Sequence, residues 1–75
     1  MNAERRKRIA AVVEILESAY GELEEIQSEE EEAFENLPES LQESENGQAS
    51  QEAADSLEEA ASNIEEAIST LGDVN

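Results

Sequence analysis

Apolar side chains recur along the first half of the chain with the periodicity of a helix that packs against another helix. With Ile9 assigned to heptad position a, apolar residues fill most a and d positions, and position e adds three more. The apolar members are Ile9, Leu16, Leu23 and Leu37 at a, Val12, Ala19, Ile26 and Ala33 at d, and Val13, Tyr20 and Phe34 at e. A repeat of about 3.5 residues indicates a coiled-coil-like helix. We therefore predict a helix over about residues 3–36, whose apolar pattern is broken once, at Glu30.

The second half of the chain shows the same repeat, and it predicts a helix over about residues 48–71. Its a positions are Ser50, Leu57, Ile64 and Leu71, its d positions are Ala53, Ala60, Ala67 and Val74, and Ala54, Ala61 and Ile68 fall at e. Branched residues alternate with alanine along this face. Small side chains allow a neighbouring helix to approach closely.

The segment over about residues 37–47 is expected to connect these helices through a short helical turn. Pro38 disfavours helical backbone for the residue before it and suits the first turn of a helix. Asn46-Gly47 tolerates left-handed backbone and is expected to end the turn. Two long helices joined by so short a connection form an antiparallel pair. The apolar residues expected to pack at the bend are Phe34, Leu37 and Leu41.

Residues 1–75 are thus expected to form one all-α domain, an antiparallel helical hairpin, that is too small to be stable alone. A core of this size rarely contributes more than about 3–5 kcal/mol. The chain has no cysteine for disulfides, and without cysteine and histidine it lacks the ligands that zinc prefers. We therefore expect a second copy to complete a four-helix bundle, with higher oligomers as the alternative. The residues expected at this interface are Ile9, Val12, Val13, Ile15 and Leu16.

The charge of the chain is almost entirely of one sign. It has 21 Asp and Glu residues against 4 Lys and Arg residues, a formal net charge of −17. All four basic residues lie in the run Arg5 to Arg8. Nucleic acids and anionic membranes would repel the rest of the molecule, and no apolar run approaches the roughly 20 residues of a membrane span. The expected protein is cytoplasmic and binds neither nucleic acid nor membrane directly.

The sequence also predicts a protein without catalytic activity, cofactor or metal. General acid–base catalysis needs a group that titrates near the working pH, and the chain has no histidine. The run Glu29 to Glu32 lacks the loop spacing of a calcium site. A helix spreads such a run around its axis, so we expect only diffuse accumulation of cations there.

An acidic surface without basic partners suggests two uses, solubility or mimicry of a nucleic acid. Ordinary surface helices gain about 0.2–0.5 kcal/mol from each Glu–Lys pair one turn apart, and this chain lacks such pairs after Arg8. Mimicry predicts that the protein binds and blocks a basic host protein. The residues expected to make that contact are Glu22, Glu25, Glu29, Glu32, Glu58, Glu59, Glu65 and Glu66. The alternative is a coiled-coil structural or adaptor module whose acid only confers solubility.

The basic run allows two interpretations. In an antiparallel hairpin it lies near the end of the second helix, where it would neutralise Asp73 and the terminal carboxylate. Alternatively, Arg5, Arg6 and Arg8 would contact phosphate, which suggests a protein that sequesters a phosphorylated signalling nucleotide.

The basic start, the Glu-rich helix and the stretch Pro38-Glu39-Ser40-Leu41-Gln42 resemble small acidic proteins of bacteriophages and prophages, a group of unassigned function. The resemblance implies a context rather than a site. Such proteins often bind and block host machinery, such as restriction or CRISPR complexes.

Overall fold

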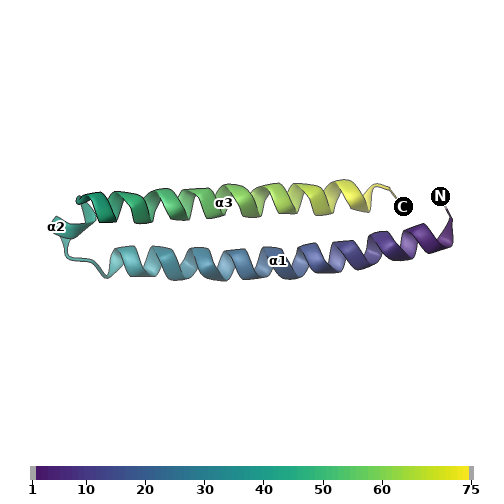
Figure 1. Ribbon diagram of the computed structural model, residues 1–75, viewed down its shortest axis with the longest axis horizontal. Coiled ribbons are helices and arrows are strands. Elements are labelled where there is room, and N and C mark those ends of the chain that lie inside the picture. Colours follow the sequence, from purple (N-terminus) through teal and green to yellow (C-terminus); the bar gives the residue numbers. More distant parts are fainter. Residues whose placement is uncertain (1, 75) are drawn as a thin grey trace.

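The computed structural model describes residues 2–74 and shows an antiparallel helical hairpin. It contains α1 (Ala3–Glu35), α2 (Glu39–Gln42) and α3 (Glu45–Gly72). Figure 1 shows α1 and α3 side by side along their length, with the short α2 at the bend. The start of α1 and the end of α3 lie at the other, open end. The Cα atoms extend over 58 × 14 × 12 Å, so the hairpin is a rod. The expected all-helical hairpin with a helical turn at its bend is confirmed.

The two long helices meet chiefly through heptad positions a and e, whereas at position d only the alanines Ala19, Ala60 and Ala67 are partly buried. The residues that follow the seam and are at least partly buried are Ile9, Val13, Leu16, Tyr20, Leu23, Gln27, Glu30 and Phe34 on α1, and Gly47, Ser50, Ala54, Leu57, Ala61, Ile64, Ile68 and Leu71 on α3. The expectation that d positions face the partner helix is wrong for Val12 and Ile26, which are 46% and 41% exposed. Position e faces the partner helix because on α1 it carries larger apolar side chains than position d. Burying these side chains removes more apolar surface from water.

The core of the hairpin is thin. Among the described residues only Ala54 and Ala61 are buried apolar side chains, with 8% and 4% of their surface exposed. Both are small and face the larger side chains of α1, so the helices approach closely. The other seam residues keep part of their surface in water. A single hairpin therefore has little buried apolar surface to stabilise it.

The bend is held by side-chain hydrogen bonds to the ends of the helices. The Gln42 amide donates to the carbonyl oxygens of Leu37 and Phe34, at 3.0 and 3.3 Å, which satisfies acceptors at the end of α1. Phe34 and Leu37 are partly buried there, whereas Leu41 is 49% exposed. The expected apolar contact at the bend is therefore wrong for Leu41, because Gln42 takes the inward position on α2.

The second long helix begins at Glu45, three residues earlier than the sequence pattern predicted. Ser44 is its N-cap, and the Ser44 Oγ accepts the backbone N–H of Gly47 at 3.3 Å. A serine cap followed by an acidic residue stabilises a helix start. Gly47 lies inside this first turn, and among residues 2–74 no residue adopts a positive φ. The prediction of a left-handed turn at Asn46-Gly47 is therefore wrong.

A polar contact interrupts the apolar seam near the bend. The Ser50 hydroxyl donates a hydrogen bond to the Glu30 carboxylate at 2.5 Å, and both residues are partly buried. This pair occupies two facing a positions, as the break in the sequence pattern indicated. It also fixes the register, because residue 30 of α1 is level with residue 50 of α3.

Glu30→Leu should raise the free energy of unfolding by about 1 kcal/mol, because a leucine there continues the apolar seam and removes a partly buried carboxylate. The Ser50 hydroxyl can then bond to a carbonyl of its own helix. Thermal unfolding followed by circular dichroism measures the change. Glu32→Leu, at an exposed position of the same helix, is the control and should leave the melting temperature nearly unchanged. A lower melting temperature for Glu30→Leu would show that the polar pair stabilises the seam more than an apolar contact.

No helix within residues 2–74 combines the length and the apolar character that crossing a membrane requires.

Candidate functional site

Carboxylates of both long helices gather on one side of the hairpin. Because a and e form the seam of an antiparallel pair, positions b and f of both helices lie on one side, and d and g lie on the other. Two grooves follow the first side, with volumes of about 330 and 250 Å³. We call this side the acidic face and define it by the carboxylates that line these grooves, which are Glu24, Glu31, Glu35, Asp55, Glu58 and Glu65.

The pKa of Tyr20 reflects how close the carboxylates of the acidic face lie to its hydroxyl. It lies between the two helices, in the groove lined by Glu24, Glu58 and Glu65. A hydrogen bond from its hydroxyl to Glu65, together with desolvation and the negative charges of Glu24 and Glu65, raises the pKa of Tyr20 from 10.0 to about 12. Ionised Tyr20 would add a further negative charge to this face. The face therefore strongly favours groups that carry positive charge or donate hydrogen bonds.

The protein should lose stability as the pH rises from about 10 to about 12, because folded Tyr20 keeps its proton to a higher pH than an unfolded tyrosine. Its contribution to stability is complete below about pH 10. Absorbance of the phenolate measures this single tyrosine directly. Glu65→Gln should lower the midpoint of the titration towards 10, whereas Glu59→Gln, on the outer edge of α3, should change it little. An ordinary midpoint in the unmutated protein would contradict the contact between Tyr20 and Glu65.

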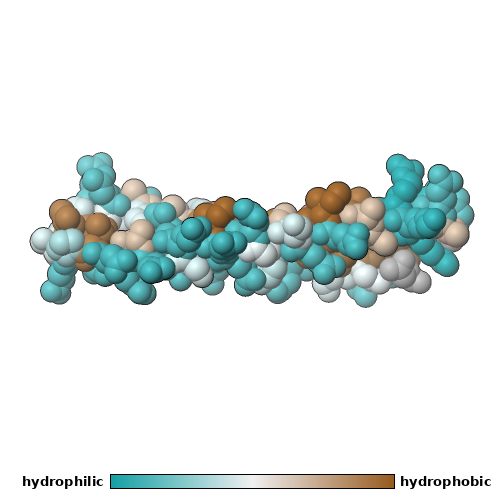
Figure 2. Space-filling view, turned by 90° about the horizontal axis from the view of Figure 1, so that it is seen from below, coloured by the Kyte–Doolittle hydropathy of each residue, from teal (hydrophilic) through white to brown (hydrophobic). Residues whose placement is uncertain are grey.

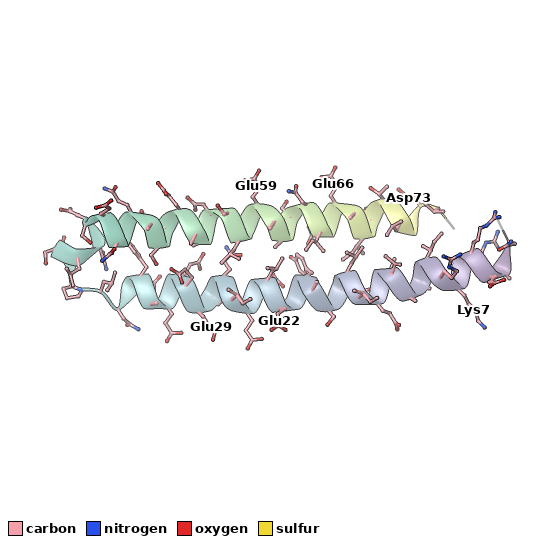
Figure 3. All side chains as sticks on the ribbon, in the orientation of Figure 1. Lys7, Glu22, Glu29, Glu59, Glu66 and Asp73 are labelled. Atoms are coloured by element: carbon pink, nitrogen blue, oxygen red, sulfur yellow. The ribbon has the colours of Figure 1, made fainter. Side chains whose placement is uncertain are left out.

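The eight glutamates that the sequence suggested as a contact surface do not form one patch. Glu58 and Glu65 lie on the acidic face. Figure 3 shows Glu22 and Glu29 on the outer edge of α1, and Glu59 and Glu66 on the outer edge of α3, pointing away from the facing helix. Glu25 and Glu32 are exposed, at outward c positions of α1. The rod thus carries carboxylates on the acidic face and on both outer edges.

Four residues of the acidic face were missing from the set that the sequence suggested: Glu24, Glu31, Glu35 and Asp55. The sequence does contain a spacing that points to some of them. Glu24 and Glu31 are seven residues apart, as are Glu58 and Glu65. A seven-residue spacing places side chains on one side of a supercoiled helix. Recognising that side required the a and e seam.

The five residues expected to bind a second copy divide between the inside and the outside of the hairpin. Ile9, Val13 and Leu16 face α3 within the same chain and are partly buried. Val12 and Ile15 are 46% and 67% exposed. Of the five, only Val12 and Ile15 expose a large part of an apolar side chain to another molecule.

The basic run forms an extension of α1 beyond the last turn of α3 (Figure 1). Arg5 and Arg8 line a groove of about 330 Å³ together with Ile9, Val12 and Leu71. Arg6 is exposed and does not line this groove, so the three arginines are not brought together. In Figure 3, Lys7 points away from α3, and Asp73 lies on the outer edge of α3. Lys7 and Asp73 therefore do not face each other.

The acidic side chains do not converge on a metal position. Within residues 2–74, no three of the acidic residues come together in an arrangement that could hold an ion.

Comparisons with protein family models, with curated proteins and with solved structures found no match for this chain.

Proposed function

We propose that this chain is a non-enzymatic binding protein whose acidic face occupies a basic, nucleic-acid-binding groove on another protein. The observation that carries the proposal is the alignment of carboxylates from two antiparallel helices along one side of a rod. Glu24 and Glu31 line the grooves from α1, and Asp55, Glu58 and Glu65 line them from α3. A DNA duplex likewise presents two antiparallel rows of negative charge.

The density of charge along the rod supports this comparison. The chain has 21 carboxylate side chains over a length of 58 Å, or about one per 2.8 Å. Duplex DNA has one charge per about 1.7 Å of its axis. A protein that binds phosphates through Lys and Arg side chains would therefore meet a comparable field. Release of counterions and electrostatic steering would favour the association.

The rigidity of the rod matters as much as its charge. Both rows of carboxylates are fixed on helices, so no ordering of the backbone is needed when the partner binds. The resemblance to acidic bacteriophage proteins supports a host nucleic-acid-processing or defence protein as the partner, in the cytoplasm of the host cell.

Displacement of DNA tests this function. A fluorescently labelled duplex is bound to a purified bacterial protein that binds DNA without sequence preference, and this chain is titrated in. We expect displacement at low salt that weakens steeply between about 0.1 and 1 M salt, as the screening length falls from about 10 to 3 Å. The variant Glu24→Gln/Glu31→Gln/Glu58→Gln/Glu65→Gln should displace the duplex at least about tenfold less well.

A variant with the same net charge separates the acidic face from charge in general. Glu22→Gln/Glu29→Gln/Glu59→Gln/Glu66→Gln removes four carboxylates from the outer edges. It should retain most of the displacement. Equal losses in both variants would mean that total charge, and not the acidic face, determines binding. Displacement that does not depend on salt would contradict the mimicry of nucleic acid.

A structural or adaptor module is the second candidate, and it is favoured by the apolar side chains that the hairpin leaves exposed, Val12 and Ile15 above all. For such a module, both quadruple Gln variants should leave partner binding intact. Sequestration of a nucleotide has less support, because only Arg5 and Arg8 share a groove.

A further inference from the structure

The side of the hairpin opposite the acidic face has a different chemical character. Of the five large apolar side chains that are exposed in the described chain, four occupy d or g positions and therefore share this side. They are Val12, Ile15, Ile26 and Val74, with 46%, 67%, 41% and 40% of their surface exposed. Figure 2 views the molecule from the α1 side and shows brown apolar patches at intervals along one edge, among teal polar residues.

The contribution of α3 to this side carries no charge over its whole length. Its d and g positions are Asn46, Ala49, Ala53, Ser56, Ala60, Asn63, Ala67 and Thr70, and Val74 continues the pattern just beyond the helix. Carboxylates occupy most of the b and c positions of this helix, yet its eight successive d and g positions are all uncharged. A second molecule could therefore approach this side without electrostatic repulsion. We call the d and g positions of both helices the neutral face, although α1 adds Glu22 and Glu29 at its outer rim.

Charge is distributed unevenly along the neutral face. At the open end, Arg5 and Arg8 line an apolar groove of about 330 Å³ with Ile9, Val12 and Leu71. Towards the bend, the g position of α1 carries Glu29, and Glu22 lies near the middle. The neutral face of α1 is therefore positive at the open end and negative towards the bend.

We propose that the neutral face binds a second copy of the chain, face to face and with the rods antiparallel, so that the open end of each copy lies against the bend half of the other. The occupant is a second copy because the same face supplies both the apolar residues and the complementary charges. An interface with two-fold symmetry pairs a surface with itself. Here that pairing brings the basic end of one α1 beside the acidic end of the other.

The register of the hairpin locates the two-fold axis. The contact between Ser50 and Glu30 shows that Ala60 of α3 is level with residue 20 of α1, next to Ala19. An axis that passes there lies about midway between Arg8 and Glu29 along α1. Arg8 then lies within about one helical turn of Glu29 of the second copy, since both occupy g positions.

The same axis brings the exposed apolar residues together. Ile15 faces Ile26 of the second copy, and Val12 lies one turn further along. On α3, Ala60 packs against Ala60 of the second copy, and Ala53 packs against Ala67. Side chains this small allow the two α3 helices to approach closely.

The parallel arrangement is disfavoured by charge. It would gather both basic runs at one end, and α1 of each copy would lie over the uncharged d and g positions of α3 of the other, so Arg8 would have no carboxylate opposite it. The antiparallel arrangement instead brings Arg8 close to Glu29 of the second copy. It leaves both acidic faces on the outside of the bundle. The dimer would carry 42 carboxylates over 58 Å, about one per 1.4 Å, and this inference does not depend on the proposed function.

Sedimentation equilibrium tests the interface. We expect the unmutated protein to be a dimer at micromolar concentrations and Ile15→Glu to raise the dissociation constant by at least about 100-fold, since it puts a charge opposite Ile26. Ile15 is 67% exposed, so the hairpin itself should keep its helical circular dichroism. Ser18→Glu adds the same charge at an exposed outward position and should still dimerise. A monomeric unmutated protein, another stoichiometry, or equal assembly of both variants would overturn the proposal.

A single cysteine tests the orientation, because the chain has none of its own. In the antiparallel dimer, Ala60→Cys should form a disulfide-linked dimer rapidly on mild oxidation. Ser62→Cys, which lines a groove on the acidic face, should not. In a parallel dimer, cysteine at position 60 would face position 19 of the second copy. Efficient cross-linking of mixed Ala19→Cys and Ala60→Cys proteins, without cross-linking of Ala60→Cys alone, would overturn the antiparallel arrangement.

Discussion

Gly47→Ala should lower the melting temperature of the protein by about 10–20 °C, equivalent to about 2–3 kcal/mol for a domain of this size. A Cβ atom at Gly47 would lie 2.5 Å from the carbonyl oxygen of Leu41 and 2.6 Å from the carbonyl carbon of Gln42. It would be closer still to the carbonyl oxygen of Gln42. These atoms belong to the backbone, which cannot move aside as a flexible side chain can. The first turn of α3 must therefore separate from α2 or unwind, and the Ser44 cap is weakened with it.

Gly21→Ala is the matched control for this prediction. Gly21 lies inside α1, and a Cβ atom there would meet nothing within 4 Å. Alanine favours the helix over glycine by about 1 kcal/mol, so this variant should melt a few degrees higher. Both changes are measured by thermal unfolding. If Gly47→Ala melted at the same temperature as the unmutated protein, α3 would have to begin after Gly47, as the sequence pattern alone predicted.

Ala61→Leu should destabilise the hairpin by about 2–3 kcal/mol, because Ala61 is 4% exposed and is the most buried apolar side chain described. It shares a groove with Tyr20 and Gln27 of α1. A leucine there would push the two helices apart in the middle of the rod. The separation would also move Tyr20 away from Glu65, so the pKa of Tyr20 should fall from about 12 towards 10.

Ala11→Leu makes the same chemical change at an exposed position of α1 and should alter stability by less than about 0.5 kcal/mol. Denaturant unfolding separates the two variants, and absorbance of the phenolate provides the second measurement. A stable Ala61→Leu protein with an unchanged Tyr20 titration would show that the helices pack less closely at this point.

The helices and their pairing could be predicted because the seven-residue repeat is strong in both halves of the chain. The choice between d and e as the second seam position could not be predicted from the sequence. Both carry apolar residues, so the preference depends on which side chains meet across the seam. Tyr20 and Phe34 at e are larger than Ala19 and Ala33 at d, and Ala54 and Ala61 offer them space. Such a comparison needs both helices in register.

This choice of seam also determined how much of the candidate site could be predicted. If position d formed the seam, nothing would mark Glu24 and Glu31 as members of a site, and the glutamates of the outer edges would be the more obvious candidates. With e in the seam, Glu24 and Glu31 join Glu58 and Glu65 around Tyr20. The same rotation turns Val12 and Ile26 outwards. The separation of the rod into an acidic and a neutral face is therefore a property of the packed pair, although every residue in it is visible in the sequence.

The extension of α1 beyond α3 has a practical consequence for handling the molecule. Lys7 is the only lysine in the chain, and it lies on this extension, pointing away from the hairpin. Reagents that couple to lysine amines should therefore attach the protein to a sensor surface by one end of the rod. Every molecule would then be attached in the same orientation, with its acidic face accessible to an analyte. Trypsin, which cuts after lysine and arginine, should trim that end and leave the remainder as one fragment, folded or not.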